Sequence, residues 1–519
     1  MRDGSLFNPW PESYMGKTLM IQGTASHVGK SVLTAAFCRI LKRKGYSVAP
    51  FKAQNMSNNS YVTKDGGEMG RAQAVQAEAC GLAPSVLMNP VLLKPDTDKK
   101  AQVVALGKVA ARVSSIGDAG YQRRFLPVVQ DALEKLMNAY EVVVIEGAGS
   151  CAEINLKKRD LVNMSIAKSV KAPVILVGNI DWGGIFAQLV GTFELLDREE
   201  KKLVKAFIVN KFRGEIKLLQ PGIDWIKKRT KRKVMGVIPY IRDLGLAEED
   251  SITGQGLEPE NGRTHKKYFI DVLWLPRISN FTDFEPLKKH KDIRLRYLPK
   301  PDPHTLPDLL IVPGTKSTIA DLKYLYRSGL ADHVKRAHAA GVPVLGICGG
   351  YQMLGGKIYD SAGVESEDQE IQGLGLLPIA TTYERKKRTV QVKARHLESG
   401  TDISGYEIHM GQTRMLKKMP SFSRILEEGG KKKESFDGAL MKTKHSFGSS
   451  WVAGTYLHGL FDTPAFLRVL LAQIEKKSGS NGFSKLGRTD KKPVINVYDR
   501  LADIIETHLD IAYFESLLA

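Results

Sequence analysis

The segment GICGG (346–350) places one cysteine between glycines at the end of an apolar run. A strand that ends in such a turn and leads into a helix forms a nucleophile elbow, in which glycines relieve crowding and the side chain points out above the sheet. The N-terminus of the following helix favours the thiolate, which is the attacking form of a cysteine. A buried structural thiol is the competing interpretation. The sequence therefore raises Cys348 as a candidate nucleophile.

A reactive thiolate needs a group that moves protons, and His458 follows another apolar strand in the segment GTYLHG (454–459). A lone cysteine is often simply buried and a lone histidine is usually structural, but together, in these settings, they favour a catalytic dyad. Such a dyad also needs donors for an oxyanion. We expect one from the backbone N–H of Gly349 and a second from Gly314 in the turn IVPGTKS (311–317).

A second candidate site lies in MIQGTASHVGKSVLTAAF (20–37), where an apolar strand runs into a glycine-containing turn and an amphipathic helix. This is the setting of a loop that binds phosphate through backbone N–H groups and a helix N-terminus. Five residues separate its two glycines, one more than in the common form of the motif. We expect the loop to bind ATP through Gly23, Thr24, Gly29, Lys30 and Ser31, with Ser31 also a ligand of Mg²⁺.

A metal–phosphate site also needs a carboxylate at the end of a neighbouring strand, and VVVIEGAGS (142–150) supplies Glu146 there. A solvated or helix-capping glutamate is the alternative for this residue. The segment FIVNKFRG (207–214) similarly ends a strand with Asn210 and Lys211. We expect the amide to hydrogen-bond the edge of the ATP base and the lysine stem to cover its face.

The amino-acid composition limits the classes of protein to which the chain can belong. With 519 residues, 43% of them hydrophobic and 25% charged, the chain is globular and too long for a single core. No stretch approaches the roughly 20 apolar residues that span a bilayer, and the N-terminus lacks the apolar core of a signal peptide, so we expect no membrane partner and a cytoplasmic location. The 4 cysteines are scattered without CxxC or Cys/His ligand spacing, which argues against a disulfide framework and a structural zinc site.

The formal net charge of +20 raises the question of nucleic acid as a partner. The basic runs 227–233, 384–388 and 431–433 lack interleaved aromatic residues and match no nucleic-acid-binding module. We therefore expect a solvated basic surface and no nucleic-acid partner. A field that attracts polyanionic small molecules is the alternative.

Two sets of apolar runs alternate with helical patterns, which predicts two parallel sheets covered by helices on both faces. The runs span residues 18–23, 47–52, 141–147, 172–178, 205–210 and 234–240 in the first set, and 269–275, 308–314, 343–348 and 451–459 in the second. The polar, aperiodic stretch between the sets is typical of a linker. The segment 427–436, rich in Lys, Glu and Gly, favours a surface loop, and the segment 499–518 has helical spacing and should pack on one of the two domains.

The cysteine elbow and the strand-end histidine resemble the class I, or triad, glutamine amidotransferases. That family usually carries a glutamate two residues after the histidine, where this chain has Leu460. The cobyric/cobyrinic branch also lacks this glutamate, so another group must orient His458 if any does. The N-terminal half resembles the dethiobiotin-synthetase type of P-loop domain, which has the longer glycine loop.

Longer strings closely resemble the cobyric acid synthase family over nearly the whole chain, with Cys151 standing where that family is expected to carry proline. The strings are FKAQNMSNNS (51–60), EMGRAQAVQAEACG (68–81), EGAGSCAEINL (146–156), RISNFTDFEPL (277–287), GYEIHMG (405–411) and GTYLHGLFD (454–462). The resemblance implies an α/β protein of two doubly wound domains, a P-loop NTPase-like parallel sheet and a flavodoxin-like class I glutamine amidotransferase domain. The boundaries expected are 17–246 for the amidoligase domain, 247–267 for the linker, 268–480 for the amidotransferase domain and 481–519 for a helical extension.

The same resemblance implies a glutamine-hydrolysing ligase of cobalamin biosynthesis, which amidates the b, d, e and g carboxylates of adenosylcobyrinic acid a,c-diamide. It would use ATP, Mg²⁺ and glutamine as the ammonia donor, act on small-molecule substrates and hold no tightly bound prosthetic group. The residues assigned in this way to the corrinoid or to phosphates are Lys52, Gln54, Asn55, Ser57 and Asn58. Tyr406 and His409 are also assigned to substrate, and support of the thiol site is the alternative for His409. The oligomeric state stays open.

Two alternatives remain at this point. The sister cobyrinic acid a,c-diamide synthases would share both sites and modify different carboxylates. A P-loop regulatory ATPase with an inert amidotransferase-like module belongs to a different class, and the joint presence of Cys348 and His458 argues against it.

Overall fold

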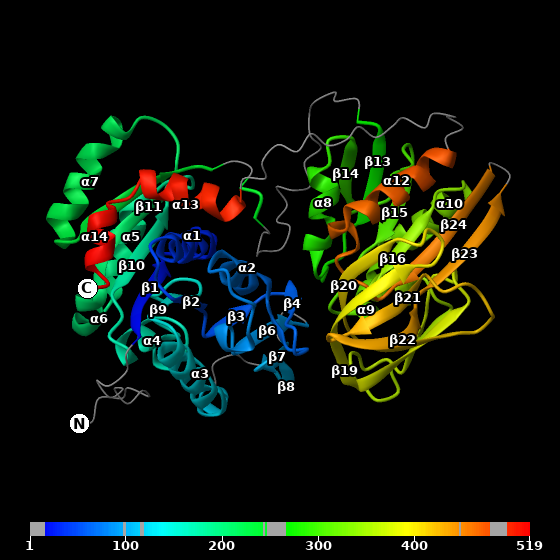
Figure 1. The fold of residues 1–519 in the computed structure, drawn as a ribbon, viewed down its shortest axis with the longest axis horizontal. Helices are drawn as coiled ribbons and strands as arrows, with labels where there is room; N and C mark the ends of the chain where they lie inside the picture. Colours follow the sequence, from blue (N-terminus) through cyan, green and yellow to red (C-terminus); the bar gives the residue numbers. More distant parts are fainter. Residues whose placement is uncertain are drawn as a thin grey trace.

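The computed structural model describes residues 16–96, 100–114, 119–241, 244–246, 266–445, 448–477 and 496–519. They form two units that lie side by side, one built mainly from the N-terminal half and one from residues 268–477 (Figure 1). Most of the predicted linker, 247–267, and the first part of the predicted extension, 481–519, lie outside the described residues. No helix in the described part of the chain is both long enough and apolar enough to cross a membrane.

A six-stranded parallel sheet with the order β12-β11-β10-β1-β9-β2 forms the centre of the N-terminal unit. Its strands are β1 (Lys17–Gly23), β2 (Val48–Phe51), β9 (Val142–Glu146), β10 (Val174–Asn179), β11 (Val204–Phe212) and β12 (Lys233–Pro239). Successive side chains of a strand point to opposite faces, so Leu19 and Ile21 belong to one buried cluster and Met20 to the other. The sheet is therefore apolar on both faces and covered by helices on both, as predicted.

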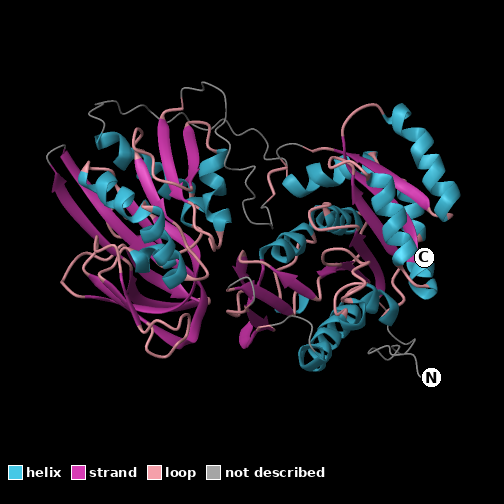
Figure 2. Cartoon of the chain, turned by 180° about the vertical axis from the view of Figure 1, so that it is seen from behind, coloured by secondary structure: helices cyan, strands magenta, loops and turns pink. Residues whose placement is uncertain are grey.

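Helices from distant parts of the sequence cover these two faces. One face carries α3 (Ala119–Ala139), α4 (Met164–Ser169), α5 (Ile185–Leu195) and α7 (Ile216–Thr230), and the other carries α1 (Lys30–Arg43), α13 (Val497–Thr507) and α14 (Ile511–Ser516). Phe514 stacks on Phe37 at 4.9 Å, and Arg39 donates hydrogen bonds of 2.7 and 2.8 Å to Asp499. The segment 499–518 thus packs on the N-terminal unit, although the C-terminal unit precedes it in the chain (Figures 1 and 2).

Short elements between residues 54 and 113 were not predicted from the sequence. They are a four-stranded sheet of β3 (Gln54–Met56), β6 (Val91–Pro95), β7 (Ala101–Ala105) and β8 (Lys108–Val113), a hairpin of β4 (Ser60–Val62) and β5 (Glu68–Gly70), and helix α2 (Arg71–Ala79). Strands of 3 to 6 residues are too short to show a clear hydrophobic period. Figures 1 and 2 place these elements between the large N-terminal sheet and the C-terminal unit.

The C-terminal unit is built on a second six-stranded sheet with the order β14-β13-β15-β16-β24-β23, in which only the edge strand β23 runs antiparallel. Its strands are β13 (Tyr268–Leu273), β14 (Ile293–Leu298), β15 (Leu309–Val312), β16 (Val344–Ile347), β23 (Ala439–His445) and β24 (Gly448–Thr455). Helices α9 (Thr318–Ser328), α10 (Leu330–Ala339) and α12 (Pro464–Lys477) contribute buried side chains to the same core. With the first sheet, this confirms the predicted class of two doubly wound α/β units.

A third sheet extends the C-terminal unit and corrects one expectation. Its strands are β17 (Lys357–Tyr359), β18 (Glu370–Gln372), β19 (Ile379–His396), β20 (Asp402–Met415), β21 (Ser423–Glu428) and β22 (Lys431–Asp437). The prediction of a surface loop at 427–436 was wrong, because these residues end β21 and begin β22 around a turn at Gly429 and Gly430, which have φ angles of 53° and 79°. Backbone pairing at the sheet edge forms a hairpin whose charged side chains stay in solvent.

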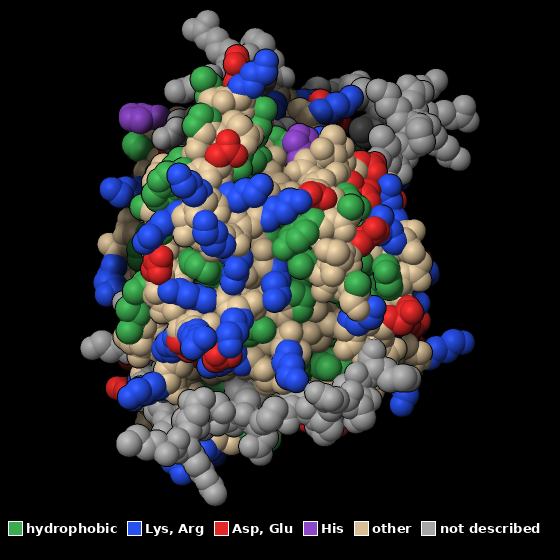
Figure 3. All heavy atoms as spheres, turned by 90° about the vertical axis from the view of Figure 1, so that its left-hand side faces the viewer, with side chains coloured by type: hydrophobic (Ala, Val, Ile, Leu, Met, Phe, Trp, Pro, Cys, Tyr) green, Lys and Arg blue, Asp and Glu red, His purple; other side chains and the backbone are tan. Residues whose placement is uncertain are grey.

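The basic run 227–233 lies at the end of α7 and the start of β12, on the side of the molecule away from the C-terminal unit (Figure 1). Figure 3 shows many Lys and Arg side chains on this face. A shallow hollow there is lined by Lys202, Lys205, Lys227, Lys231, Arg232, Lys233 and Tyr513. Carboxylates offset part of this charge, since Lys202 contacts Glu199 at 2.7 Å and Lys233 pairs with Asp510.

Candidate active site

The turn at Cys348 has the geometry of a nucleophile elbow. Strand β16 ends at Ile347, Cys348 adopts φ 51° and ψ −108°, and the short helix α11 (Gly349–Met353) begins at once. A positive φ at a residue with a side chain stores strain, which is typical of functional positions. Packing also requires a glycine two residues after Cys348, because a Cβ at Gly350 would lie 1.9 Å from the carbonyl oxygen of Val312.

Neighbouring parallel strands bring Cys348 and His458 together. Strands β16 and β24 pair in the register Ile347 to Thr455, so both residues follow strand ends at the same edge of the sheet. A Cβ at Gly314, just after β15, would lie 3.1 Å from Cε1 of His458 and 3.7 Å from Cβ of Cys348. The thiol and the imidazole therefore flank one point, with Gly314 beside them.

Asp283 completes this group, and the sequence analysis did not identify it. Its Oδ2 lies 2.6 Å from Nδ1 of His458, and its Oδ1 accepts a hydrogen bond of 3.1 Å from the N–H of Gly459. Burial by itself lowers the pKa of His458, but the Asp283 carboxylate and the Cys348 thiol raise it, to about 10. A carboxylate in this place fixes the ring orientation and the Nδ1–H tautomer, which leaves Nε2 free to exchange a proton with the thiol.

Asp283 belongs to the segment RISNFTDFEPL (277–287), one of the strings on which the family resemblance is based. The signal that could have identified it is an acidic side chain in that segment to which no role had been assigned. It lies in a 3₁₀ turn, Phe281–Phe284, far in sequence from His458. Leu460, at the position of the usual glutamate, is buried.

The other predicted residues of this half lie around the same point. Gly349 opens the helix directly after Cys348. The Tyr406 ring stacks on the imidazole of His458 with 5.1 Å between centroids, and His409 stacks on Tyr456 at 3.7 Å. The Nδ1 of His409 lies 2.8 Å from the carbonyl oxygen of Gly411. Tyr406 and His409, assigned to substrate by resemblance, thus lie at the thiol site.

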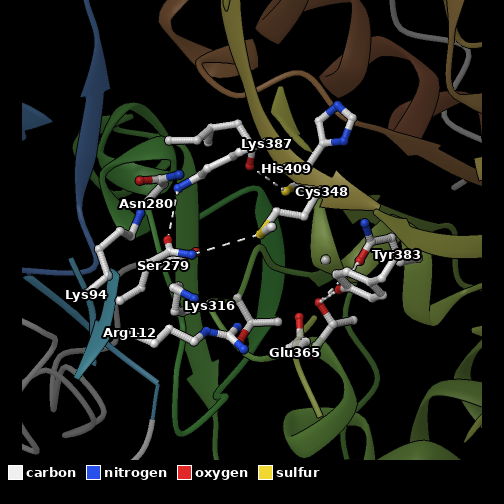
Figure 4. Close-up of a pocket in the computed structure, with 17 residues that line it drawn as sticks. Lys94, Arg112, Ser279, Asn280, Lys316, Cys348, Glu365, Tyr383, Lys387 and His409 are labelled. Atoms are coloured by element: carbon white, nitrogen blue, oxygen red, sulfur yellow. Dashed lines mark hydrogen bonds between the residues drawn. The ribbon is translucent and has the colours of Figure 1, made fainter. Parts of the chain in front are cut away.

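A pocket opens at Cys348 between the two units (Figure 4). Its polar lining from the N-terminal unit is Lys94, Gln102 and Arg112, and from the C-terminal unit it includes Ser279, Asn280, Lys316, Glu365, Tyr383, Lys387 and His409. Burial lowers the pKa of Lys387 to about 8, although the nearby Glu68 carboxylate opposes this effect. Cations and a carboxylate around one thiol suit an amino acid, which carries both charges.

The glycine loop of the N-terminal unit connects β1 to α1. Gly29 adopts φ 100°, a conformation that favours glycine. The ammonium of Lys30 donates hydrogen bonds of 2.9 Å to the carbonyl oxygens of Ala25 and Gly149, so it is held over the loop. A Cβ at Gly23 would lie 2.9 Å from this ammonium, and the Thr24 hydroxyl donates to Gln188 at 3.3 Å. These residues form the cradle expected of a phosphate site.

Glu146 lies at the centre of a buried polar cluster beside that loop. Its Oε1 accepts hydrogen bonds of 2.8 Å from Ser31 and 2.9 Å from Lys52, and its Oε2 accepts one of 2.6 Å from Gln76. The Oε1 of Gln76 is buried without a hydrogen-bond partner. Hydroxyl, carboxylate and amide oxygens are the ligands that Mg²⁺ takes, so the donor set fits this ion. Within the described ranges, no group of three or more His, Cys, Asp or Glu side chains could hold a metal ion.

Asn210 and Lys211 both contact the backbone of the same loop. The Asn210 amide donates a hydrogen bond of 2.8 Å to the carbonyl oxygen of Val28, and the Lys211 ammonium donates one of 3.0 Å to that of His27. Both therefore brace the loop backbone. The Lys211 ammonium also lies 5.9 Å from the ring centroid of Trp182, an exposed aromatic residue.

The predicted substrate segment from Lys52 to Asn58 leads away from Glu146 toward the C-terminal unit. Much of its hydrogen bonding is internal to the N-terminal unit. Gln54 accepts from Tyr121 at 2.5 Å, Asn55 donates to Gln73 at 3.0 Å, and Ser57 accepts from the N–H of Asn59 at 3.0 Å. Asn58 differs, since its buried Oδ1 has no hydrogen-bond partner.

Both halves of the chain match known family models. The CobQ/CobB/MinD/ParA nucleotide binding domain matches residues 19–253, and the CobB/CobQ-like glutamine amidotransferase domain matches residues 269–466. The two matches together contain every candidate residue described above.

Curated relatives are similar over nearly their whole length. A cobyric acid synthase of Dehalococcoides mccartyi is 46% identical over 505 residues, which cover 96% of this chain and 97% of the relative. That of Desulfitobacterium hafniense is 44% identical over 520 residues, covering 96% and 97%. That of Streptococcus sanguinis is 46% identical over 499 residues, covering 96% and 98%.

Proposed function

The chain belongs to the cobyric acid synthase family, and on this premise we propose that it amidates the b, d, e and g carboxylates of adenosylcobyrinic acid a,c-diamide with ATP and glutamine. The observation that carries the proposal is the arrangement of Cys348, His458 and Asp283 at a pocket between the two units. An inert amidotransferase-like module would not need a buried carboxylate bonded to a buried imidazole beside a strained cysteine.

Activation of the acid is assigned to the N-terminal unit. A carboxylate is a poor acyl donor because its leaving group would be oxide, and transfer of a phosphoryl group from ATP makes an acyl phosphate instead. Lys30 and the loop N–H groups would stabilise the charge on that phosphoryl group. When bound, Mg²⁺ would neutralise part of the same charge, held by Ser31 and Glu146, which lie 2.8 Å apart through their oxygen atoms.

Supply of ammonia is assigned to the C-terminal unit. Cys348 attacks the side-chain amide of glutamine, the N–H groups near Gly349 and Gly314 receive the oxyanion, and His458 gives its proton to the departing ammonia. Water then hydrolyses the thioester to glutamate. Free ammonia would be mostly protonated at neutral pH, because amine pKa values lie well above it, so local delivery is needed. The position of the pocket between the units supports such delivery.

The test compares the wild-type chain with Cys348→Ser and, as a matched control, Cys151→Ser. Each is given the corrinoid diamide and ATP with either glutamine or ammonium, and the corrinoid products are weighed by mass spectrometry. We expect Cys348→Ser to lose glutamine-driven amidation and keep ammonia-driven amidation, while the control keeps both. Four amides added to the diamide support the proposed product, whereas no amides added to the diamide but two added to cobyrinic acid, tested in parallel, would identify the sister diamide synthase activity. Unchanged glutamine-driven amidation in Cys348→Ser would overturn the nucleophile assignment.

A further inference from the structure

Two backbone segments connect the N-terminal unit directly to the thiol site. The N–H of Ser60 donates a hydrogen bond of 2.9 Å to Oδ1 of Asn280, and the N–H of Phe281 donates one of 3.2 Å to Oδ1 of Asn59. Asn280, Ser60 and Asn59 are all buried. Asn280 also adopts a φ of 52°, so its backbone is held in a strained conformation at this contact.

The Ser60 contact fixes which way the Asn280 amide faces. A backbone N–H can only donate, so the atom opposite Ser60 must be the amide oxygen, and the NH₂ group then faces Nε2 of His458 at 3.4 Å. An NH₂ donor requires a lone pair on Nε2. Because Nδ1 of the ring is bonded to Asp283, this orientation favours the neutral imidazole with its proton on Nδ1.

This orientation of the Asn280 amide disfavours the imidazolium form of His458, which is the next state of the reaction. When Cys348 passes its proton to His458, Nε2 becomes a donor and meets the NH₂ donor of Asn280. The other ionisable side chains near the ring are Asp283, Tyr406, Asp462 and Arg71. Of these, Asp283 favours the imidazolium through its contact with Nδ1. Asn280 is the group that faces Nε2, the nitrogen that the thiol uses.

We propose that Asn280 is a positioning residue through which the N-terminal unit restrains glutamine hydrolysis. While Ser60 holds its oxygen, the NH₂ group of Asn280 opposes protonation of Nε2, against the effect of Asp283, and so lowers the fraction of Cys348 present as thiolate. Release of Ser60 lets the amide turn and accept the Nε2 proton. Ser60 follows the segment that starts at Lys52, whose ammonium contacts Glu146, so occupancy of the phosphate site can reach the restraint. The inference rests on the proposed function for the identity of the two substrates.

The key variant is Asn280→Asp in the full chain, because a carboxylate accepts from Ser60 and from protonated Nε2 at the same time. Asn280→Ala removes the NH₂ donor without adding a charge. Asn59→Asp is the matched control, since it also adds a carboxylate that accepts a backbone N–H across the interface, but it does not face His458. The first readout is the pH profile of alkylation of Cys348 by iodoacetamide, followed by peptide mass mapping.

For Asn280→Asp we expect the midpoint of alkylation to fall by about one pH unit or more. Glutamine hydrolysis without ATP and corrinoid should rise at least about tenfold, and adding both should raise it no further, whereas they stimulate the wild type. Asn280→Ala should shift both readouts in the same direction by a smaller amount, and Asn59→Asp should match the wild type.

Ammonia-driven amidation is the control that shows each variant to be folded. If Asn280→Asp loses this activity, the alkylation profile and basal glutamine hydrolysis of Asn280→Ala decide whether the proposal holds. Alkylation profiles of the Asn280 variants that superimpose on the wild type, or basal hydrolysis that stays level or falls, would overturn the proposal. A wild-type chain that hydrolyses no glutamine would instead refute the proposed function, while the alkylation profiles would still report on the restraint.

Discussion

Replacing Asp283 by asparagine tests the arrangement that the sequence did not reveal. The N–H of Gly459 donates to one carboxylate oxygen, so the new side chain must keep its oxygen there and turn its NH₂ group toward Nδ1 of His458. That donor requires a lone pair on Nδ1 and drives the ring proton to Nε2. The imidazole then has no lone pair facing Cys348 and cannot take the thiol proton.

The expected loss of glutamine-driven amidation follows from the electrostatic interaction between Asp283 and His458. Asp283 is the main reason that the pKa of His458 rises from 6.5 to about 10. This net rise, which remains after the opposing effect of burial, corresponds to about 5 kcal/mol in favour of the imidazolium. We therefore expect glutamine-driven amidation to fall by about 10³ to 10⁴-fold, with ammonia-driven amidation unchanged, because Asp283 does not contact the phosphate loop.

Both activities are measured on the same preparation by the mass of the corrinoid products. Asp462→Asn is the control, since that acid lies beside Gly459 and makes no hydrogen bond to the imidazole. If Asp283→Asn kept more than one-tenth of the wild-type glutamine-driven rate, the assignment of Asp283 as the group that orients His458 would fail.

Two further substitutions probe packing and ionisation. In Gly350→Ala the added Cβ would lie 1.9 Å from the carbonyl oxygen of Val312, so we expect a loss of about 1–3 kcal/mol in the free energy of unfolding and of most glutamine hydrolysis. Gly356→Ala is the control, because its Cβ would meet nothing closer than 3.6 Å. It should change neither the free energy of unfolding, measured by urea denaturation, nor the rate of glutamine hydrolysis. Burial and the nearby Glu407 carboxylate raise the pKa of Asp437 to about 7 from 3.8. The stability linked to this group is therefore full below pH 4 and is lost as the pH rises through 7, up to about 4 kcal/mol in all. Asp437→Asn should flatten the dependence of the unfolding free energy on pH across this range in urea titrations, and an unchanged slope would contradict the assignment.

The parts of the site that the sequence predicted are those built from contiguous residues. A cysteine elbow needs its glycines within two positions of Cys348, and the phosphate loop needs Lys30 and Ser31 at the start of one helix. The strand ends that carry Cys348 and His458 could also be predicted, because long apolar runs mark buried parallel strands. Comparison with the cobyric acid synthases confirms the family that these motifs indicated.

The parts that it did not predict depend on contacts between distant segments. Leu460 occupies the position of the usual triad glutamate, and nothing local to His458 points to Asp283 in a different turn. The strands between residues 54 and 113 are too short for a period, and the hairpin at 423–437 carries consecutive charged residues at 427–428 and 431–434, which hide any strand alternation. Each of these features depends on a contact with a residue or strand that is distant in the sequence, and a local sequence pattern does not reveal such contacts.

The return of α13 and α14 to the N-terminal sheet affects the order in which the protein can be completed during synthesis. Phe514 fills a position against Phe37, so the first unit to leave the ribosome lacks part of one face until the last residues of the chain have been translated. A truncation made between the units would leave that apolar face uncovered. The N-terminal unit therefore depends for its folding on residues that follow the C-terminal unit, and the N-terminal half of the chain is not a natural fragment to express alone.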